Sequence, residues 1–322
     1  MSPFTAANGL TNPHLQTLLP RLIRRAACFT PVWQTLTTPD NDFLDLAWSE
    51  PATPCVDKPI FVLFHGLEGS FYSPYANGLM DAFARHGWLS VMMHFRGCSG
   101  KPNRLARAYH SGETEDARFV LEYLRAQFPL RTIIATGVSL GGNMLVNYLA
   151  RYRDDPIVDA ATIISAPLDL AACSQRIEQG FSKIYRRYLL SSLKNNALKK
   201  APLLQDELGL TTQCIRQVSK LYQFDDLITA PLHGFKDAQE YYQQCSGLMK
   251  LGAITIPTLI IHAADDPFMT EAVIPRGPLN PEINYQLFEH GGHVGFLTGS
   301  LGQPRFWLEQ ALPSYYADWQ QR

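Results

Sequence analysis

Residues 132–142 read Thr-Ile-Ile-Ala-Thr-Gly-Val-Ser-Leu-Gly-Gly, an apolar run that leads directly into a Gly-x-Ser-x-Gly motif. Residues 141–152 have helical spacing, so Ser139 lies between a predicted strand and a predicted helix. A serine at the tip of such a tight turn is held in strained backbone geometry with its hydroxyl exposed. The pattern therefore predicts that Ser139 is a nucleophile. The alternative is a glycine-rich turn in which Ser139 only caps the helix.

Apolar runs and helical patterns alternate on both sides of this motif. The sequence predicts strands at 60–64, 88–95, 131–138, 160–165, 256–262 and 285–288. It predicts helices at 74–85, 114–128 and 141–152, and a closing helix that begins with residues 305–312. This alternation predicts an α/β fold with a mainly parallel central sheet flanked by helices. Residues 31–59 hold five prolines around the alternating segment 44–48, a pattern typical of edge strands joined by loops.

Residues 169–252 interrupt the alternation. They contain no buried-strand run, but many Lys, Arg, Gln, Tyr and Leu residues at helical spacing. We interpret them as a helical cap or lid inserted into a core formed by residues 59–168 and 253–322. Residues 1–58 are expected to pack on that core. Caps commonly shape and shield a binding pocket.

A serine hydroxyl is a weak nucleophile at neutral pH, so a base oriented by a third group must lie within hydrogen-bond reach. When the nucleophile lies on a turn of this kind, the acid and the histidine follow the serine in that order. Asp265 and Asp266 follow the strand 256–262, and the carboxyl ends of such strands face the ligand crevice. We favour Asp266, with Asp265 as the alternative. An Asp-Asp-Pro turn without a catalytic role is the structural alternative.

The candidate base lies in the glycine-rich segment Glu-His-Gly-Gly-His-Val-Gly at residues 289–295. Its glycines allow a loop to present His293 without crowding, so we favour His293 as the base. His290 is closer to the preceding strand and is the alternative. His262 is interpreted as an ordinary strand residue.

The segment His-Gly-Leu-Glu-Gly-Ser at residues 65–70 follows the strand 60–64. A loop at this place supplies one backbone N–H to an oxyanion hole, and the residue after the nucleophile supplies the other. The predicted donors are therefore Leu67 and Leu140. His65 is interpreted as a structural residue that fixes the loop.

These motifs together resemble the AB hydrolase 4 family of the AB-hydrolase superfamily, and most closely its bacterial YheT-type hydrolases. The matching segments are 12–17, 64–70, 94–100, 110–116, 137–144, 224–226, 263–268 and 290–296. The resemblance implies the α/β-hydrolase fold, with a triad of Ser139, Asp266 and His293. It also implies an esterase acting on carboxylic esters, with a link to lipid metabolism in some relatives. Ala263 departs from the Gly that the superfamily usually has there, so Asp265 stays open as the acid.

Composition narrows the classes of partner. The chain has 322 residues, 46% of them hydrophobic, and a net charge of −1, which gives no field that favours nucleic acid. Its six cysteines lack zinc-ligand spacing. A serine mechanism needs no metal or organic cofactor, so none is expected. No secretory signal or membrane span is recognised, which predicts a cytoplasmic location.

Residues 15–25 combine leucines with arginines. We expect them to pack on the hydrolase body, with peripheral contact to anionic lipid as the alternative.

The leading hypothesis is a serine carboxylesterase (EC 3.1.1.-) that cleaves short- to medium-chain esters through an acyl-enzyme on Ser139. The first alternative is an acyltransferase that passes the same acyl group to an alcohol or thiol. The second is a non-catalytic ligand-binding protein with this fold. The sequence leaves the physiological substrate and the oligomeric state open.

Overall fold

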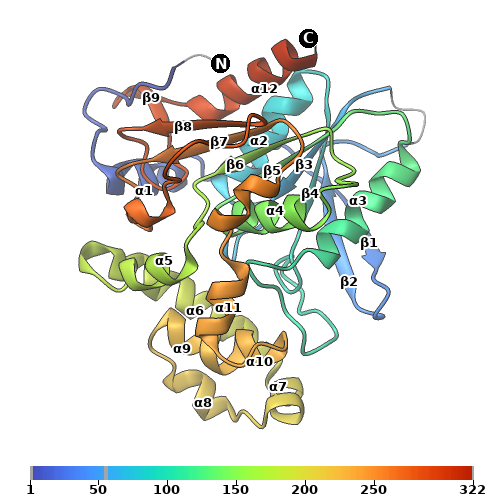
Figure 1. Cartoon of the computed structure of the whole chain (residues 1–322), viewed down its shortest axis with the longest axis vertical. Coiled ribbons are helices and arrows are strands. Elements are labelled where there is room, and N and C mark those ends of the chain that lie inside the picture. Colours follow the sequence, from blue (N-terminus) through green and yellow to red (C-terminus); the bar gives the residue numbers. More distant parts are fainter. Residues whose placement is uncertain (1–2, 54–56, 321–322) are drawn as a thin grey trace.

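The computed structural model describes residues 3–53 and 57–320, which contain an eight-stranded sheet (Figure 1). The strands lie in the order β1-β2-β4-β3-β5-β6-β7-β8. Their bounds are β1 (Val32–Thr37), β2 (Phe43–Trp48), β3 (Ile60–Phe64), β4 (Leu89–Met93), β5 (Ile133–Val138), β6 (Ala160–Ile164), β7 (Thr258–Ala263) and β8 (Ile283–Phe288). The six strands β4, β3, β5, β6, β7 and β8 run parallel to one another, and β2 is antiparallel to both of its neighbours. The predicted α/β fold is confirmed.

Helices cover both faces of this sheet. On one face lie α2 (Pro74–Arg85) and α12 (Trp307–Gln320), where the Phe83 ring stacks on the Phe61 ring of β3 with centroids 3.9 Å apart. On the other face, α3 (Glu115–Gln127) and α4 (Leu140–Arg151) pack against the alternate side chains of the same strands. Strands buried on both faces read as continuous apolar runs, which is why the sequence located them well.

The segment between β6 and β7 is helical. It contains α5 (Leu170–Arg176), α6 (Lys183–Lys199), α7 (Ala201–Leu208), α8 (Thr212–Gln217), α9 (Leu221–Phe224), α10 (Ala230–Leu232), α11 (Ala238–Cys245) and the short turns η1 (Gly180–Ser182), η2 (Asp225–Thr229) and η3 (Leu248–Ala253). Figure 1 shows most of these helices gathered at the lower end of the view, away from the sheet. Leu190, Leu204, Ile215, Phe224 and Ile228 form a small core of their own there. The division of the chain into core and cap stays a prediction.

Two expectations about the strands need correction. The segment 44–48 is no edge strand, because β1 covers its outer side and Leu46 is fully buried. The helix expected from residue 305 begins at Trp307, because the preceding residues form β10 (Gln303–Phe306), which pairs with β9 (Leu297–Ser300). This short hairpin depends on pairing with a neighbouring strand, so helical spacing alone misled the prediction.

Residues 1–2, 54–56 and 321–322, which include Cys55, lie outside the described part of the chain. The N-terminal helix α1 (Pro13–Ile23) coincides with most of the amphipathic segment 15–25. Its Gln16 and Pro20 are buried, whereas Leu22 is 61% exposed. Within residues 3–53 and 57–320, no helix is long and apolar enough to cross a bilayer.

Candidate functional site

Ser139 lies on the turn between β5 and α4, with φ +53° and ψ −120°. L-residues rarely adopt this conformation, so the surrounding structure must hold it in place. Tight packing of backbone against backbone does so. A Cβ added to Gly141 would lie 2.5 Å from the Phe64 carbonyl oxygen, and one on Gly137 would collide with the Gly141 carbonyl. The two glycines therefore allow β5, α4 and the end of β3 to meet.

His293 lies beside the serine hydroxyl. Its Nε2 is 3.0 Å from Ser139 Oγ, and its Nδ1 is 2.8 Å from Oδ2 of Asp266. The imidazole stacks on the Phe268 ring with centroids 4.0 Å apart, which limits its rotation. Asp266 is 4% exposed, and its Oδ1 accepts the Phe268 N–H at 2.8 Å. With Asp266 ionised, Nδ1–H donates to the carboxylate and Nε2 is free to accept the serine proton.

The other candidate acid and histidines lie elsewhere in the site. Asp265 accepts the Gly292 N–H at 2.9 Å and faces the His290 ring at 3.4 Å, so it holds the histidine loop. Burial raises the pKa of the Asp265 carboxyl. His262 is buried in β7 between the Ala166 carbonyl and a tyrosine hydroxyl. Of the predicted residues, the structure brings together Ser139, His293 and Asp266.

The loop at residues 65–70 approaches the serine closely. A Cβ added to Gly66 would lie 3.1 Å from the Cβ of Ser139. Within the described chain, neither the Leu67 N–H nor the Leu140 N–H donates a hydrogen bond. His65 fixes the loop, since its Nε2 accepts the Phe95 N–H at 3.0 Å and its Nδ1 lies 2.7 Å from the Gly66 carbonyl. Burial lowers the pKa of His65 to about 3, so the ring is neutral.

Glu68 is a residue of this loop whose role the sequence analysis missed. Its backbone has φ +55°, and its N–H donates to the Tyr109 hydroxyl at 2.9 Å. The carboxylate accepts hydrogen bonds from Tyr109 at 2.8 Å, Ser192 at 2.7 Å and Asn196 at 2.6 Å. Burial raises the pKa of the Glu68 carboxyl. Since Ser192 and Asn196 belong to α6, Glu68 joins this loop to the helical segment.

The N-terminal helix α1 supports the loop at residues 289–295 that carries His293. Nothing in the sequence indicated this contact. Thr17 Oγ1 on α1 accepts the His293 N–H at 2.9 Å. The buried Gln16 side chain accepts the Leu297 N–H at 2.7 Å and donates to the Leu297 carbonyl at 3.1 Å. A Cβ on Gly292 would lie 2.5 Å from the Pro13 carbonyl. No local pattern could reveal contacts between segments so far apart in the sequence.

A cavity of about 470 Å³ opens beside Ser139 and extends under the helical segment. Its lining is mostly apolar. Besides Leu67, Leu140 and His293 from the body, the lining includes Ile184, Tyr188, Leu189, Leu193, Leu204 and Phe224 from the helices. Such a lining suits an apolar chain attached to a polar group near the serine.

Comparisons with known proteins identify the family to which this fold belongs. The family described as "alpha/beta hydrolase fold" matches residues 59–300. The Escherichia coli (strain K12) protein named "Putative esterase YheT" is 53% identical over 97% of this chain and 92% of its own. Mouse "Phospholipase ABHD3" is 27% identical over 83% of this chain and 66% of its own. The solved esterase Pf2001 of Pyrococcus furiosus has a TM-score of 0.53 at 15% identity, covering 98% of this chain and 95% of its own. That likeness concerns the fold alone.

Proposed function

This chain belongs to the α/β-hydrolase fold family, and we propose that it is a serine esterase that cleaves short- to medium-chain carboxylic esters. One observation carries the proposal. Ser139 Oγ, the His293 ring and the Asp266 carboxylate form a continuous hydrogen-bonded chain, with links of 3.0 Å and 2.8 Å. This is the geometry that a serine nucleophile needs for activation.

The proposed reaction has two steps. In the first, Ser139 attacks the ester carbonyl while Nε2 of His293 takes its proton, and the histidine then protonates the leaving alcohol. Asp266 keeps the imidazole in the correct tautomer and stabilises its charged form. The N–H groups of Leu67 and Leu140 stabilise the oxyanion, and each donor of this kind contributes on the order of 10²–10³ in rate. In the second step, water releases the acid from Ser139.

Two observations support an ester substrate. The relatives named above carry the names esterase and phospholipase, and both names describe hydrolysis of ester bonds. The apolar cavity of about 470 Å³ beside Ser139 gives an acyl chain a place to lie outside water. No metal ion is required for this reaction.

Hydrolysis of 4-nitrophenyl butyrate by Ser139→Ala tests the proposal. We expect loss of nearly all turnover, because removing the nucleophile of a comparable serine enzyme costs on the order of 10⁶. Ser314→Ala, at an exposed serine of α12, is the matched control and should retain wild-type turnover. A fluorophosphonate should label the wild-type chain on the peptide that contains residue 139. Undiminished turnover by Ser139→Ala would reject the mechanism, and an unlabelled wild type would favour a ligand-binding protein.

A further inference from the structure

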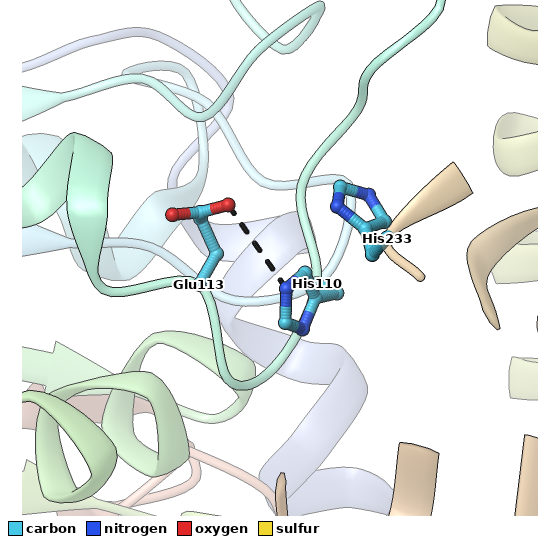
Figure 2. Close-up of side chains that lie close together, drawn as sticks. All are labelled: His110, Glu113 and His233. Carbon is cyan, nitrogen blue, oxygen red and sulfur yellow. Dashed lines mark ion pairs between the residues drawn. The ribbon is translucent and has the colours of Figure 1, made fainter. Parts of the chain in front are cut away.

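A second group of titratable side chains lies outside the proposed triad. His110 and Glu113 are on the loop between β4 and α3, and His233 directly follows α10. One ligand-type atom from each of the three side chains lies within 4.8 Å of the others. Figure 2 shows the three side chains converging, with His110 between Glu113 and His233. The centroids of the two imidazole rings are 4.4 Å apart.

The three side chains lie in a largely enclosed place. His110 and Glu113 are buried, and His233 is half-buried. Zinc binds imidazole nitrogen and carboxylate oxygen.

His233 provides an independent indication of a missing partner. Its Nε2 is buried, and no group in the described residues forms a hydrogen bond with it. Leaving such a nitrogen without a partner costs free energy, so sites of this kind usually hold a water molecule or an ion.

The existing contacts of the other two residues define what binding would change. Glu113 Oε1 accepts the Glu115 N–H at 2.8 Å, and Oε2 accepts from Arg107 at 2.9 Å. A carboxylate oxygen has a second lone pair, so Oε2 can accept from Arg107 and still bind a cation. Nδ1 of His110 accepts the Gly112 N–H at 3.2 Å and lies 3.8 Å from Cys245 Sγ.

We propose that His110, Glu113 and His233 bind one Zn²⁺ ion, with water as the fourth ligand. Two imidazoles and a carboxylate are a donor set that zinc uses. Nε2 of His110 lies 4.0 Å from Glu113 Oε2, and ligand atoms on one zinc ion are roughly 3.4 Å apart, so binding needs a movement of about 1 Å or less along this pair. Once Nε2 binds the metal, Nδ1 of His110 carries a proton. It then exchanges its contact with the Gly112 N–H for one with Cys245 Sγ.

This site goes beyond the proposed esterase reaction. It would join the loop at residues 107–114 to the helical segment between β6 and β7. The cluster borders a second, more polar cavity of about 720 Å³. His110 and Leu232 line both this cavity and the one beside Ser139. A bound ion would therefore fix the position of His110, which lines both cavities.

Calorimetric titration of Zn²⁺ into tag-free protein, previously treated with chelator, tests the proposal. We expect one Zn²⁺ per wild-type chain, and binding at least tenfold weaker in His233→Ala. His86→Ala removes an exposed histidine at the end of α2 and should bind Zn²⁺ like the wild type. Zn²⁺ should also raise the Tm of the wild type and of His86→Ala, but not the Tm of His233→Ala.

Two outcomes would overturn the site: no binding by the wild type up to about 100 μM Zn²⁺, or equal binding by His233→Ala. Glu113→Gln is a second test, expected to weaken binding at least tenfold. If Glu113→Gln fails to fold because Arg107 loses the ion pair with Glu113, the comparison of His233→Ala with the wild type decides alone. The His233 ring forms no hydrogen bond with the described residues, so its removal should leave the fold intact.

Discussion

Asn196 of α6 donates a hydrogen bond of 2.6 Å to Oε2 of Glu68, the residue that directly follows the proposed oxyanion donor Leu67. The position of the loop at 65–70 is therefore coupled to the helix above the substrate cavity. Because the Glu68 backbone lies in the left-handed region, with φ +55°, the loop depends on such contacts to keep its conformation. Glu68 is thus a candidate positioning residue for the oxyanion hole.

Glu68→Ala should lower kcat for 4-nitrophenyl butyrate about tenfold with little change in KM, since a misplaced donor affects the transition state more than the bound substrate. Glu68→Gln should restore much of the rate, because an amide can still pair with Ser192 or Asn196. Glu282→Ala, at an exposed position, is the control. A higher KM at unchanged kcat would show that Glu68 only shapes the cavity.

The two neighbouring acids should differ sharply in their effect on turnover. Asp266→Asn should lower kcat on the order of 10⁴-fold, because the amide would favour the wrong tautomer of His293. Asp265→Asn should cost less than about tenfold, since Asp265 contacts the histidine loop and not the His293 ring. Steady-state kinetics of both variants on one ester show which of the two aspartates is the triad acid. A reversal of this order would make Asp265 the triad acid.

The cavity should set the preference for acyl-chain length. Leu189 of α6 lines it, and Leu189→Trp would fill part of its volume of about 470 Å³. We expect kcat/KM for an octanoate ester to fall at least about tenfold relative to the acetate ester, since a long chain loses its apolar site. Leu189→Ala is the matched variant, and it should leave the acetate rate unchanged. If Leu189→Trp lowers kcat/KM equally for both esters, the acyl chain does not lie beside Leu189.

The nucleophile turn should tolerate no side chain at position 141. In Gly141→Ala, the new Cβ would meet the carbonyl oxygens of Phe64 and His65 at 2.5 Å. We expect the free energy of unfolding to fall by about 3 kcal/mol, at the upper end of the usual cost of overpacking. Gly252→Ala is the control, because a Cβ there meets nothing within 4 Å. Urea denaturation of both variants measures the difference, and equal stability would contradict the packing argument.

Asp225 should make stability depend on pH. It is half-buried at the wall of the cavity and accepts hydrogen bonds from Tyr242 and Thr229. Its removal from water raises the pKa of its carboxyl to about 6 from 3.8. The fold therefore favours the protonated form. As pH rises from 3.8 to 6, the unfolded chain releases this proton first, and the wild type should lose about 3 kcal/mol relative to Asp225→Asn. Urea unfolding of both proteins at pH 4 and pH 7 should record most of this loss, about 2.4 kcal/mol, because the carboxyl of the unfolded chain is already partly ionised at pH 4. A stability difference between the two proteins that stays constant with pH would contradict the shifted pKa.

The sequence predicted the strands from β3 to β7 well, because these strands are buried on both faces and therefore read as unbroken apolar runs. The edge strand β8 is partly exposed, and its predicted start at residue 285 is two residues late. The predicted bounds of β3 and of α2 agree with the structure at both ends. The hairpin of β9 and β10 was not predicted. Its strands are short and partly exposed, so their sequence carries no apolar run or clear alternation.

The residues of the candidate site also fall into two groups: those that a local motif indicated, and those that only the fold reveals. Ser139, Asp266 and His293 each follow a strand within a local motif, so their residue types and order were informative. Thr17 and Glu68 contribute through contacts with segments distant in sequence, and no local spacing reports such contacts. The cluster of His110, Glu113 and His233 escaped for the same reason. Two of its members are close in sequence, and the third comes from the helical segment.

The hydrogen bonds between Gln16 and Leu297 also bear on the order in which the fold is completed. The bonded residues are 281 positions apart in the chain. The loop that carries His293 can therefore acquire its support from α1 only after both segments have been synthesised and have folded together. A fragment that lacks either segment would hold Ser139 without a properly seated His293.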